Sequence, residues 1–302
     1  MRLRALAGLV AGGWAAWRML GPEVGPRYGP GQIRPLRVPG RTVFVGEREF
    51  FVREAGAADA PPLVLVHGWG FDGEMTFHRI VEPLAENFRV IVPDHRNHGK
   101  SDWIRGRYEV ADLADELAGV LDAIGVTKAT FFGYSLGGLV VQEMARRHSA
   151  RVERMILGAT AALPVHRLRP LARFGMWLAR SFARFSTQEI AAASSHLMLR
   201  AGALGPNHHR WMRSALLRRD PTLFYEAGHA AWRFDSRRWV GRLPQPTMVV
   251  MTGRDQIVEP VAQRELAELI PSAEVIELAT AGHESILADA GEWVDLIKRF
   301  AG

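Results

Sequence analysis

The chain of 302 residues contains no cysteine and only three lysines, Lys100, Lys128 and Lys298. Without cysteine it can form no disulfide bond, no thiolate metal site and no cysteine nucleophile. Because proteins without cysteine occur in every compartment, this absence does not locate the protein. The sequence also has no internal repeats, no low-complexity tract, and neither the Gly-x-Gly-x-x-Gly nor the Walker pattern of phosphate-binding loops.

Motifs for metal binding are missing as well. Two pairs of histidines lie close together in the sequence and could suggest a metal site, His95 with His98 and His208 with His209. No His-Glu-x-x-His motif is present, and no carboxylates cluster with these pairs in the sequence. We therefore expect no metal site.

The apolar run at the N-terminus is short. Residues 5–17 are uncharged, but these 13 residues fall below the roughly 20 that cross a bilayer. Arg2 and Arg4 precede the run. This pattern is compatible with a signal peptide, a short signal anchor, a helix in the membrane interface or a helix packed on the protein. Residues 21–40 are rich in proline and glycine and predict a linker. We expect residues 1–40 to associate with a membrane, and the protein to be otherwise cytoplasmic.

Positive charge is concentrated in two segments. The whole chain has a formal net charge of +6; residues 1–41 carry +6 and residues 154–219 carry +10, so the remainder carries −10. An acidic body with two basic segments favours an acidic surface as a partner. We retain anionic lipid headgroups as the candidate and expect no nucleic-acid partner, because no nucleic-acid-binding motif is present. Arginine enrichment through genome composition is the alternative explanation.

From residue 41 onward, apolar strands alternate with helices. The expected strands cover residues 42–45, 49–53, 63–67, 89–93, 129–132, 154–157, 247–251 and 273–278. The expected helices cover residues 77–87, 109–124, 137–148, 260–269 and 284–300, with Pro83 as a residue that can kink or shorten the first of them. The first two strands flank a Gly-Glu turn and predict an antiparallel pair. The rest predicts an α/β fold, with a mostly parallel central sheet and helices on both faces. Residues 41–159 and 241–302 are expected to form this core.

Residues 160–240 interrupt the alternation. They contain no clear buried strand but many arginines and aromatic residues, including Trp177 and Trp211. This pattern predicts an inserted helical cap with an apolar pocket. Pro170 can begin a helix that runs to residue 185, with arginines opposite its apolar face. Such a helix fits a membrane surface and a cap helix packed on the core equally well.

One stretch organises the chain, residues 131–138, with the sequence FFGYSLGG. A buried strand ends at Gly133, a single serine follows at Ser135, and a helix begins at once. This Gly-x-Ser-x-Gly pattern is typical of a nucleophile elbow, a strained turn from strand to helix that needs small neighbours. The helix also directs backbone N–H groups towards negative charge that develops at the serine. A tight turn with an incidental serine is the alternative interpretation.

A nucleophilic serine requires a base and a residue that orients the base. Asp255 and His283 each follow a predicted core strand. Because the carboxyl ends of parallel strands meet at one edge of the sheet, both side chains are expected beside Ser135. The order of these residues along the chain, Ser135, Asp255, His283, is also the order typical of triads whose serine lies on a nucleophile elbow. These three residues are the candidate catalytic triad.

An oxyanion hole requires two backbone N–H donors. Leu136, directly after the serine, is expected to supply one. Trp69, in the glycine-containing loop after the strand at residues 63–67, is expected to supply the other, with a plain glycine turn as the alternative. The candidate substrate-binding residues are Trp69, Tyr134, Trp177 and Trp211.

Taken together, these motifs resemble the α/β-hydrolase superfamily, in its capped esterase- and lipase-like branch, from about residue 41 to the C-terminus. The motifs are His67-Gly68-Trp69-Gly70, residues 94–101, residues 133–138, Gly253-Arg254-Asp255 and Gly282-His283. Asn97 stands where the family's Asp-x-Arg-Gly-x-Gly-x-Ser turn has glycine, a mild departure because asparagine tolerates a left-handed backbone. The resemblance implies hydrolysis of a carboxylic ester through an acyl-serine, without a cofactor.

Other functions on the same fold stay open. Carbon–carbon bond hydrolases and cofactor-free haloperoxidase- or perhydrolase-like enzymes keep the serine, and catalytically inactive binding proteins share the fold. Epoxide and haloalkane hydrolases place aspartate at the nucleophile position, so Ser135 argues against them. We expect a serine hydrolase that acts on a small-molecule ester or lipid substrate, with an anionic membrane surface as a candidate partner.

Overall fold

The computed structural model describes residues 38–164, 174, 177 and 220–302. The N-terminal run of residues 5–17, Trp211, and most of the helix predicted for residues 170–185 lie outside these ranges. No helix in the described ranges is long and apolar enough to cross a membrane.

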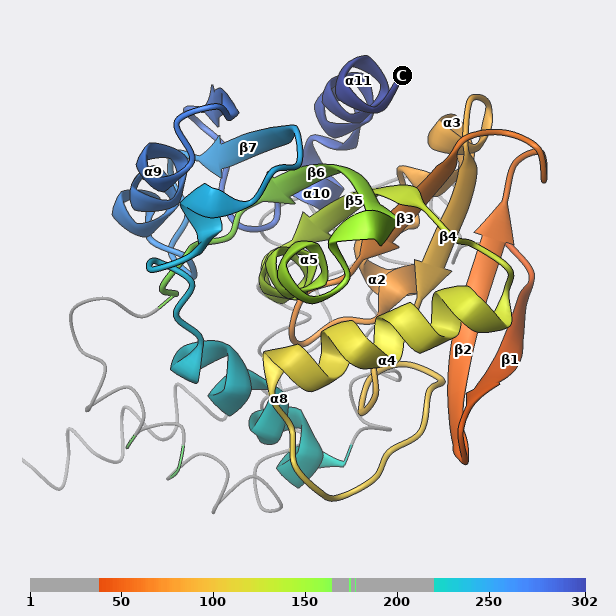
Figure 1. Ribbon diagram of the computed structural model, residues 1–302. Coiled ribbons are helices and arrows are strands. Elements are labelled where there is room, and N and C mark those ends of the chain that lie inside the picture. The colour runs from red at the N-terminus through yellow and green to blue at the C-terminus, as the bar shows by residue number, and fades with distance from the viewer. Residues whose placement is uncertain (1–37, 165–173, 175–176, 178–219) are drawn as a thin grey trace, which may run out of the picture.

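A sheet of eight strands forms the centre of the described fold (Figure 1). The strands are β1 (Gly40–Val45), β2 (Arg48–Ala55), β3 (Pro62–Val66), β4 (Arg89–Pro93), β5 (Ala129–Tyr134), β6 (Val152–Gly158), β7 (Thr247–Thr252) and β8 (Glu274–Leu278). Their order across the sheet is β1-β2-β4-β3-β5-β6-β7-β8. β2 pairs antiparallel with β1 and β4, and all other neighbours are parallel. The predicted mostly parallel sheet, with an antiparallel pair at its start, is confirmed.

Alternate side chains of the buried strands contribute to two separate apolar cores. In β3, Val64 and Val66 belong to one core, whereas Leu63 and Leu65 belong to the other, because successive side chains of a strand point to opposite faces. The first core is closed by α4 (Val110–Ala123), α5 (Leu136–Arg147) and α9 (Pro260–Leu269), and the second by α2 (Gly73–Phe77), α3 (Val81–Ala85), α10 (Ser285–Ala288) and α11 (Ala290–Ala301). Helices therefore cover both faces of the sheet, as predicted (Figure 1).

The single helix predicted for residues 77–87 is wrong. The structure has two short helices, α2 and α3, on either side of residues 78–80. α2 begins earlier than expected because the Asp72 side chain caps it, accepting a hydrogen bond from Met75 N at 2.8 Å. Pro83 lies in the first turn of α3, where its missing N–H leaves no hydrogen bond unmade. A continuous helix would place Pro83 in the interior, so the chain restarts the helix instead.

The helix predicted for residues 284–300 is likewise divided. α10 ends at Ala288, and Asp289 has a non-helical backbone with φ −112° and ψ 38°. The carbonyl of Asp289 accepts hydrogen bonds from Glu292 N and Trp293 N, which begin α11. Aspartate favours such a position at a helix start over a helix interior.

In the part of the segment between β6 and β7 that the structure describes, one α-helix packs on the core. This helix, α8 (Pro221–Arg233), contributes Ala227, Ala230 and Ala231 to the core that α4 and α5 close. Small side chains at this spacing allow α8 to approach closely. In the described part of residues 160–240 there is no strand.

Candidate active site

The turn at Ser135 joins β5 directly to α5 and has a strained backbone. Ser135 has φ 55° and ψ −119°, backbone angles that residues other than glycine rarely adopt. Hydrogen bonds on both sides hold this conformation. Ser135 N donates to the Gly158 carbonyl at 2.9 Å, and the Ser135 carbonyl accepts from Gly138 N at 2.9 Å and from Thr160 Oγ1 at 2.8 Å. The strain presents the hydroxyl at the carboxyl edge of the sheet.

Glycines around the turn allow the backbone to come close. A Cβ at Gly133 would lie 2.5 Å from the Gly137 carbonyl oxygen, and one at Gly138 would lie 2.5 Å from Thr160 Cγ2. The most severe contact is at Gly137, where a Cβ would lie 1.9 Å from the Val66 carbonyl oxygen. At Gly133 and Gly137, the two glycines of the predicted nucleophile elbow, backbone packing therefore requires a residue without a side chain.

Gly137→Ala is expected to lower the free energy of unfolding by about 3 kcal/mol or more, because the clash is with backbone of β3 that cannot rotate away. Gly291→Ala in α11 is the matched control, since a Cβ there meets nothing within 4 Å. That change should stabilise the protein by up to about 1 kcal/mol, as alanine favours helices. Urea unfolding of both variants measures the difference; equal losses would contradict the steric explanation.

The structure brings together the three predicted triad residues. His283 Nε2 lies 3.1 Å from Ser135 Oγ, and His283 Nδ1 lies 2.8 Å from Asp255 Oδ2. Asp255 follows β7 and His283 follows β8, so both come from loops at the carboxyl ends of parallel strands. The three side chains form one hydrogen-bonded series.

Asp255 is buried and surrounded by hydrogen-bond donors. Its Oδ1 accepts from Ile257 N at 2.8 Å and Val258 N at 2.9 Å. Its Oδ2 accepts from Thr252 Oγ1 at 2.7 Å and Gln263 Nε2 at 3.2 Å, in addition to His283. Burial alone would raise the pKa of Asp255, but the hydrogen bonds and the charge of His283 hold that pKa below its ordinary value. Asp255 is therefore ionised at neutral pH.

The two predicted oxyanion donors belong to segments that adjoin the serine. Leu136 is the first residue of α5, and the first N–H groups of a helix have no partner within the helix. In the loop after β3, a Cβ at Gly68 would lie 3.1 Å from Ser135 Cβ. The loop that carries Trp69 thus passes directly beside the nucleophile.

A histidine fixes the orientation of this loop. His67 Nδ1 donates to the Gly68 carbonyl at 2.9 Å, and His67 Nε2 accepts from His95 N at 3.0 Å. The second contact requires an unprotonated Nε2, so His67 is neutral with its proton on Nδ1. The Gly68 carbonyl and the Trp69 N–H belong to one peptide plane, which this hydrogen bond orients.

The Trp69 side chain is held by α8. Its Nε1 donates to the Phe224 carbonyl at 2.7 Å, and its ring centroid lies 4.9 Å from that of Phe224. Gly228 gives the indole room, since a Cβ there would lie 2.6 Å from Trp69 Cζ2. A helix 155 residues away in the chain therefore positions the residue that carries a predicted oxyanion donor.

A pocket opens beside the triad, with an empty volume of about 380 Å³ including its mouth. The residues that line it are Gly68, Trp69, Phe71, Thr76, Tyr134, Ser135, His283, Glu284, Ile286 and Leu287. Tyr134 Oη donates to the His283 carbonyl at 2.6 Å, and burial raises the pKa of this phenol. Trp177 is 55% exposed and does not line this pocket. Two of the four predicted substrate-binding residues, Trp69 and Tyr134, therefore lie at the site.

The loop after β4 packs behind the site. Asp94 accepts hydrogen bonds from Gly73 N at 3.0 Å, Lys100 N at 3.1 Å and Arg53 Nη1 at 3.1 Å. Burial and the neighbouring carboxylate of Asp72 raise the pKa of Asp94, against the opposing charge of Arg53. Asn97 has φ 61°, the left-handed backbone that its place in the motif predicts.

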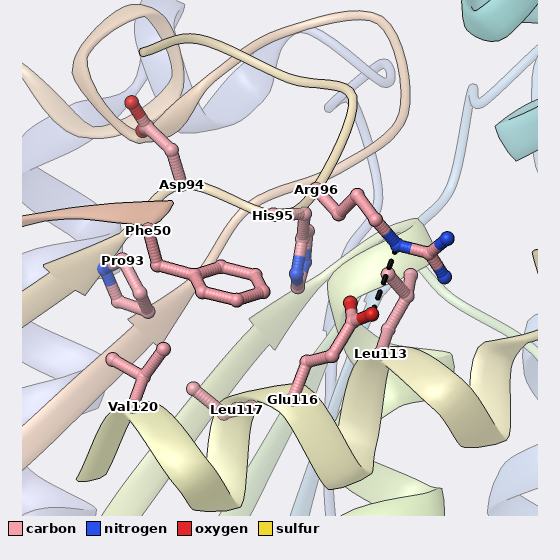
Figure 2. Close-up of a pocket in the computed structure, with 9 residues that line it drawn as sticks. All are labelled: Phe50, Pro93, Asp94, His95, Arg96, Leu113, Glu116, Leu117 and Val120. Atoms are coloured by element: carbon pink, nitrogen blue, oxygen red, sulfur yellow. Dashed lines mark ion pairs between the residues drawn. The ribbon is translucent and has the colours of Figure 1, made fainter. Parts of the chain in front are cut away.

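A second, small cavity lies between the end of β4 and α4, away from the serine. Figure 2 shows the ion pair between Arg96 and Glu116 at its edge, with Arg96 Nε 2.9 Å from Glu116 Oε1. His95 also lines it, and burial lowers the pKa of this histidine well below its ordinary value. Among the described residues, no group of three or more His, Asp or Glu side chains could hold a metal ion.

Several residues of the site were missed by sequence reasoning. Thr252 and Gln263 hold Asp255, and Gln263 comes from α9 with no motif around it. Glu284, directly after the predicted base, was also missed as a pocket residue. His67 was recognised only as part of a glycine motif. The sequence does not indicate that His67 contacts His95, which lies 28 residues further along the chain.

Comparison with known proteins gives several matches. The sequence model of a family described as alpha/beta hydrolase fold matches residues 61–290. A pimeloyl-[acyl-carrier protein] methyl ester esterase of Chromobacterium violaceum is 30% identical over 255 residues, covering 81% of this chain and 94% of that protein. The enol-lactonase of Burkholderia xenovorans LB400 has a TM-score of 0.76 at 26% identity, covering 86% of this chain and 99% of that one. A thermophilic esterase of Thermogutta terrifontis has a TM-score of 0.74 at 27% identity, covering 86% and 97%.

Proposed function

Because this chain belongs to the α/β-hydrolase family, we propose that it is a serine hydrolase that cleaves carboxylic esters. The proposal is carried by the hydrogen-bonded series from Ser135 Oγ through His283 to Asp255, at 3.1 and 2.8 Å. A base within hydrogen-bond distance of a hydroxyl, itself held by a buried carboxylate, is the arrangement that activates serine for acyl transfer. Two of the similar proteins, an esterase and a methyl ester esterase, also support ester hydrolysis.

The proposed reaction has two halves. Ser135 Oγ attacks the acyl carbonyl while His283 Nε2 takes its proton, and His283 then protonates the leaving alcohol. Water attacks the resulting acyl-serine, with His283 again as the base, and the carboxylic acid leaves. Asp255 keeps the proton of the neutral imidazole on Nδ1 and stabilises the charged imidazolium. The N–H groups of Trp69 and Leu136 stabilise the oxyanion in both halves.

The pocket supports an apolar substrate. Five of its lining side chains are aromatic or aliphatic, namely Trp69, Phe71, Tyr134, Ile286 and Leu287. Burying each additional methylene of an acyl chain against such a wall contributes about 0.8 kcal/mol. An ester of a medium or long acyl chain is therefore the substrate class that we propose.

The remaining parts of the chain are assigned by the same proposal. Residues 41–159 and 241–302 form the hydrolase core, and residues 160–240 form the cap, of which α8 contacts Trp69. Residues 1–40 are assigned to an anionic membrane surface on their charge and apolar pattern. A lipid-like ester is consistent with that location.

Hydrolysis of nitrophenyl esters from acetate to palmitate tests the proposal. We expect kcat/KM to rise about tenfold or more between acetate and octanoate, since several methylenes become buried. An aryl or alkyl fluorophosphonate should label the protein at one residue, and mass spectrometry should place the adduct on Ser135. This second measurement needs only an activated serine and no knowledge of the natural ester.

The two measurements separate the alternatives. Labelling without hydrolysis of any ester would favour a carbon–carbon bond hydrolase or a perhydrolase-like enzyme, which keep the activated serine. Neither labelling nor hydrolysis would indicate a binding protein without catalytic activity. Labelling at a residue other than Ser135 would contradict the proposed nucleophile.

A further inference from the structure

Glu284 places a carboxylate in the pocket beside the proposed base. It directly follows His283, lines the same pocket, and is half-buried. A Cβ at Gly282 would lie 2.7 Å from both Glu284 carboxylate oxygens. The carboxylate therefore folds back over Gly282, and the missing side chain of Gly282 leaves room for it.

Among the described residues that line the pocket, this carboxylate is the one acidic group. None of the other nine lining residues is an aspartate or glutamate, and none is a lysine or arginine. Within the described residues, the Glu284 side chain makes no hydrogen bond and no ion pair. Arg79 reaches the same wall, but its guanidinium donates to the Leu287 carbonyl and forms no ion pair with Glu284.

A half-buried carboxylate without an ion-pair partner among the described residues loses part of its hydration, which costs free energy. A ligand that carries a positive charge or a hydrogen-bond donor would offset this cost, whereas an anionic ligand would add to it. Trp69, Phe71 and Tyr134 line the same pocket, and aromatic faces also attract cations. Both features of the pocket therefore favour a positively charged group.

The reaction itself indicates which part of an ester meets Glu284. The leaving oxygen has to accept a proton from His283 Nε2, so the alcohol part of the ester lies on the His283 side of Ser135. The oxyanion lies on the opposite side, towards Trp69 and Leu136. Since Glu284 lines the pocket together with His283, we place its carboxylate towards the alcohol part.

We propose that Glu284 selects the substrate by charge, favouring esters whose alcohol part is cationic or neutral over esters whose alcohol part is anionic. The proposal rests on the ester hydrolase function proposed above and names the substrate class of that site. Esters of quaternary or protonated amino alcohols are the class that gains most from the carboxylate. An anionic substituent on the alcohol is repelled by it.

The test compares two esters of nearly equal shape, hexanoylcholine and 3,3-dimethylbutyl hexanoate, which differ in a quaternary nitrogen replaced by carbon. The ratio of their kcat/KM values, cationic over neutral, is measured at low ionic strength for wild type and Glu284→Gln. We expect the ratio to fall about tenfold in Glu284→Gln, equivalent to about 1.4 kcal/mol. Added salt should reduce the wild-type ratio, because the mouth of the pocket is open to screening.

Glu292→Gln is the matched control. Glu292 is exposed in the first turn of α11, does not line the pocket, and its replacement changes the net charge equally. Its ratio should stay within about twofold of wild type. A Glu284→Gln ratio no different from that of Glu292→Gln would overturn the proposal. So would a shift seen only when the charge is placed on the acyl part of the ester.

A binding measurement keeps this proposal separate from the hydrolase function. Calorimetry with the Ser135→Ala protein should give a Kd for hexanoylcholine that rises about tenfold when Glu284→Gln is added. If wild type hydrolyses no ester but this Kd still depends on Glu284, the hydrolase function fails and the charge site stands. If esters are hydrolysed but neither ratio nor Kd depends on Glu284, the charge site fails alone.

Discussion

Ser135→Ala is expected to lower kcat/KM for the best nitrophenyl ester by about 10⁴-fold or more. The only heavy atom removed is Oγ, which lies 3.1 Å from His283 Nε2 and is the only nucleophile that the protein supplies in the proposed mechanism. Water attack assisted by the oxyanion donors would supply the residual rate. Steady-state kinetics on purified wild type and variant, with active-site titration to exclude trace contamination, measures the loss.

Ser135→Gly is the control that separates chemistry from folding. At φ 55° and ψ −119° a serine holds strain of about 1 to 3 kcal/mol, which glycine does not. The glycine variant should therefore be as inactive as the alanine variant. It should nevertheless unfold at a higher urea concentration than both the alanine variant and wild type. Retention of more than about 1% of wild-type activity in either variant would contradict the role of Ser135 as nucleophile.

The positions of the triad candidates could be predicted because each depends on a local pattern. A strand that ends in Gly-x-Ser-x-Gly fixes Ser135, and two further strands fix the loops of Asp255 and His283. Parallel strands then bring the three loops to one edge without any long-range information. The structure places the three side chains within hydrogen-bond distance, and their catalytic roles stay a prediction until kinetics test them.

The features that could not be predicted depend on contacts between distant elements. Gln263 reaches Asp255 only because α9 packs against β7, and Trp69 reaches the Phe224 carbonyl only because α8 lies over its loop. Pro83 indicates in the sequence that the helix can be interrupted, but the place of the break between α2 and α3 depends on the cap that Asp72 provides for α2. Such outcomes are set by packing and by hydrogen-bond satisfaction, which no periodic pattern in the sequence records.

Asp255→Asn is the second change with a large expected effect, a loss of about 10³- to 10⁴-fold in kcat. The reason is the hydrogen bonding around the carboxylate. Ile257 N and Val258 N both donate to Oδ1, so the amide oxygen of asparagine must take that position. The amide NH₂ then takes the position of Oδ2 and faces His283 Nδ1.

This orientation reverses the tautomer of the proposed base. An NH₂ group at that position donates, so His283 Nδ1 must accept and its proton must move to Nε2. Nε2 then cannot take the proton of Ser135 Oγ. The opposite amide orientation would set the NH₂ against two backbone N–H groups, which costs about 1 to 3 kcal/mol for each unsatisfied donor. KM should change little, because Asp255 does not line the pocket.

Stability at acid pH provides the independent check on this variant. The pKa of Asp255 is lower in the folded protein than its ordinary value of 3.8. Ionised Asp255 therefore contributes stability that is fully present above about pH 4 and is lost as pH falls through the lower pKa of the folded state. Asparagine has no such contribution, so the difference in free energy of unfolding between wild type and Asp255→Asn should shrink as pH falls below about 4. A difference that stays constant or widens with acid would show that the carboxylate is not held in its ionised form, and the argument for a fixed tautomer at His283 would fail with it.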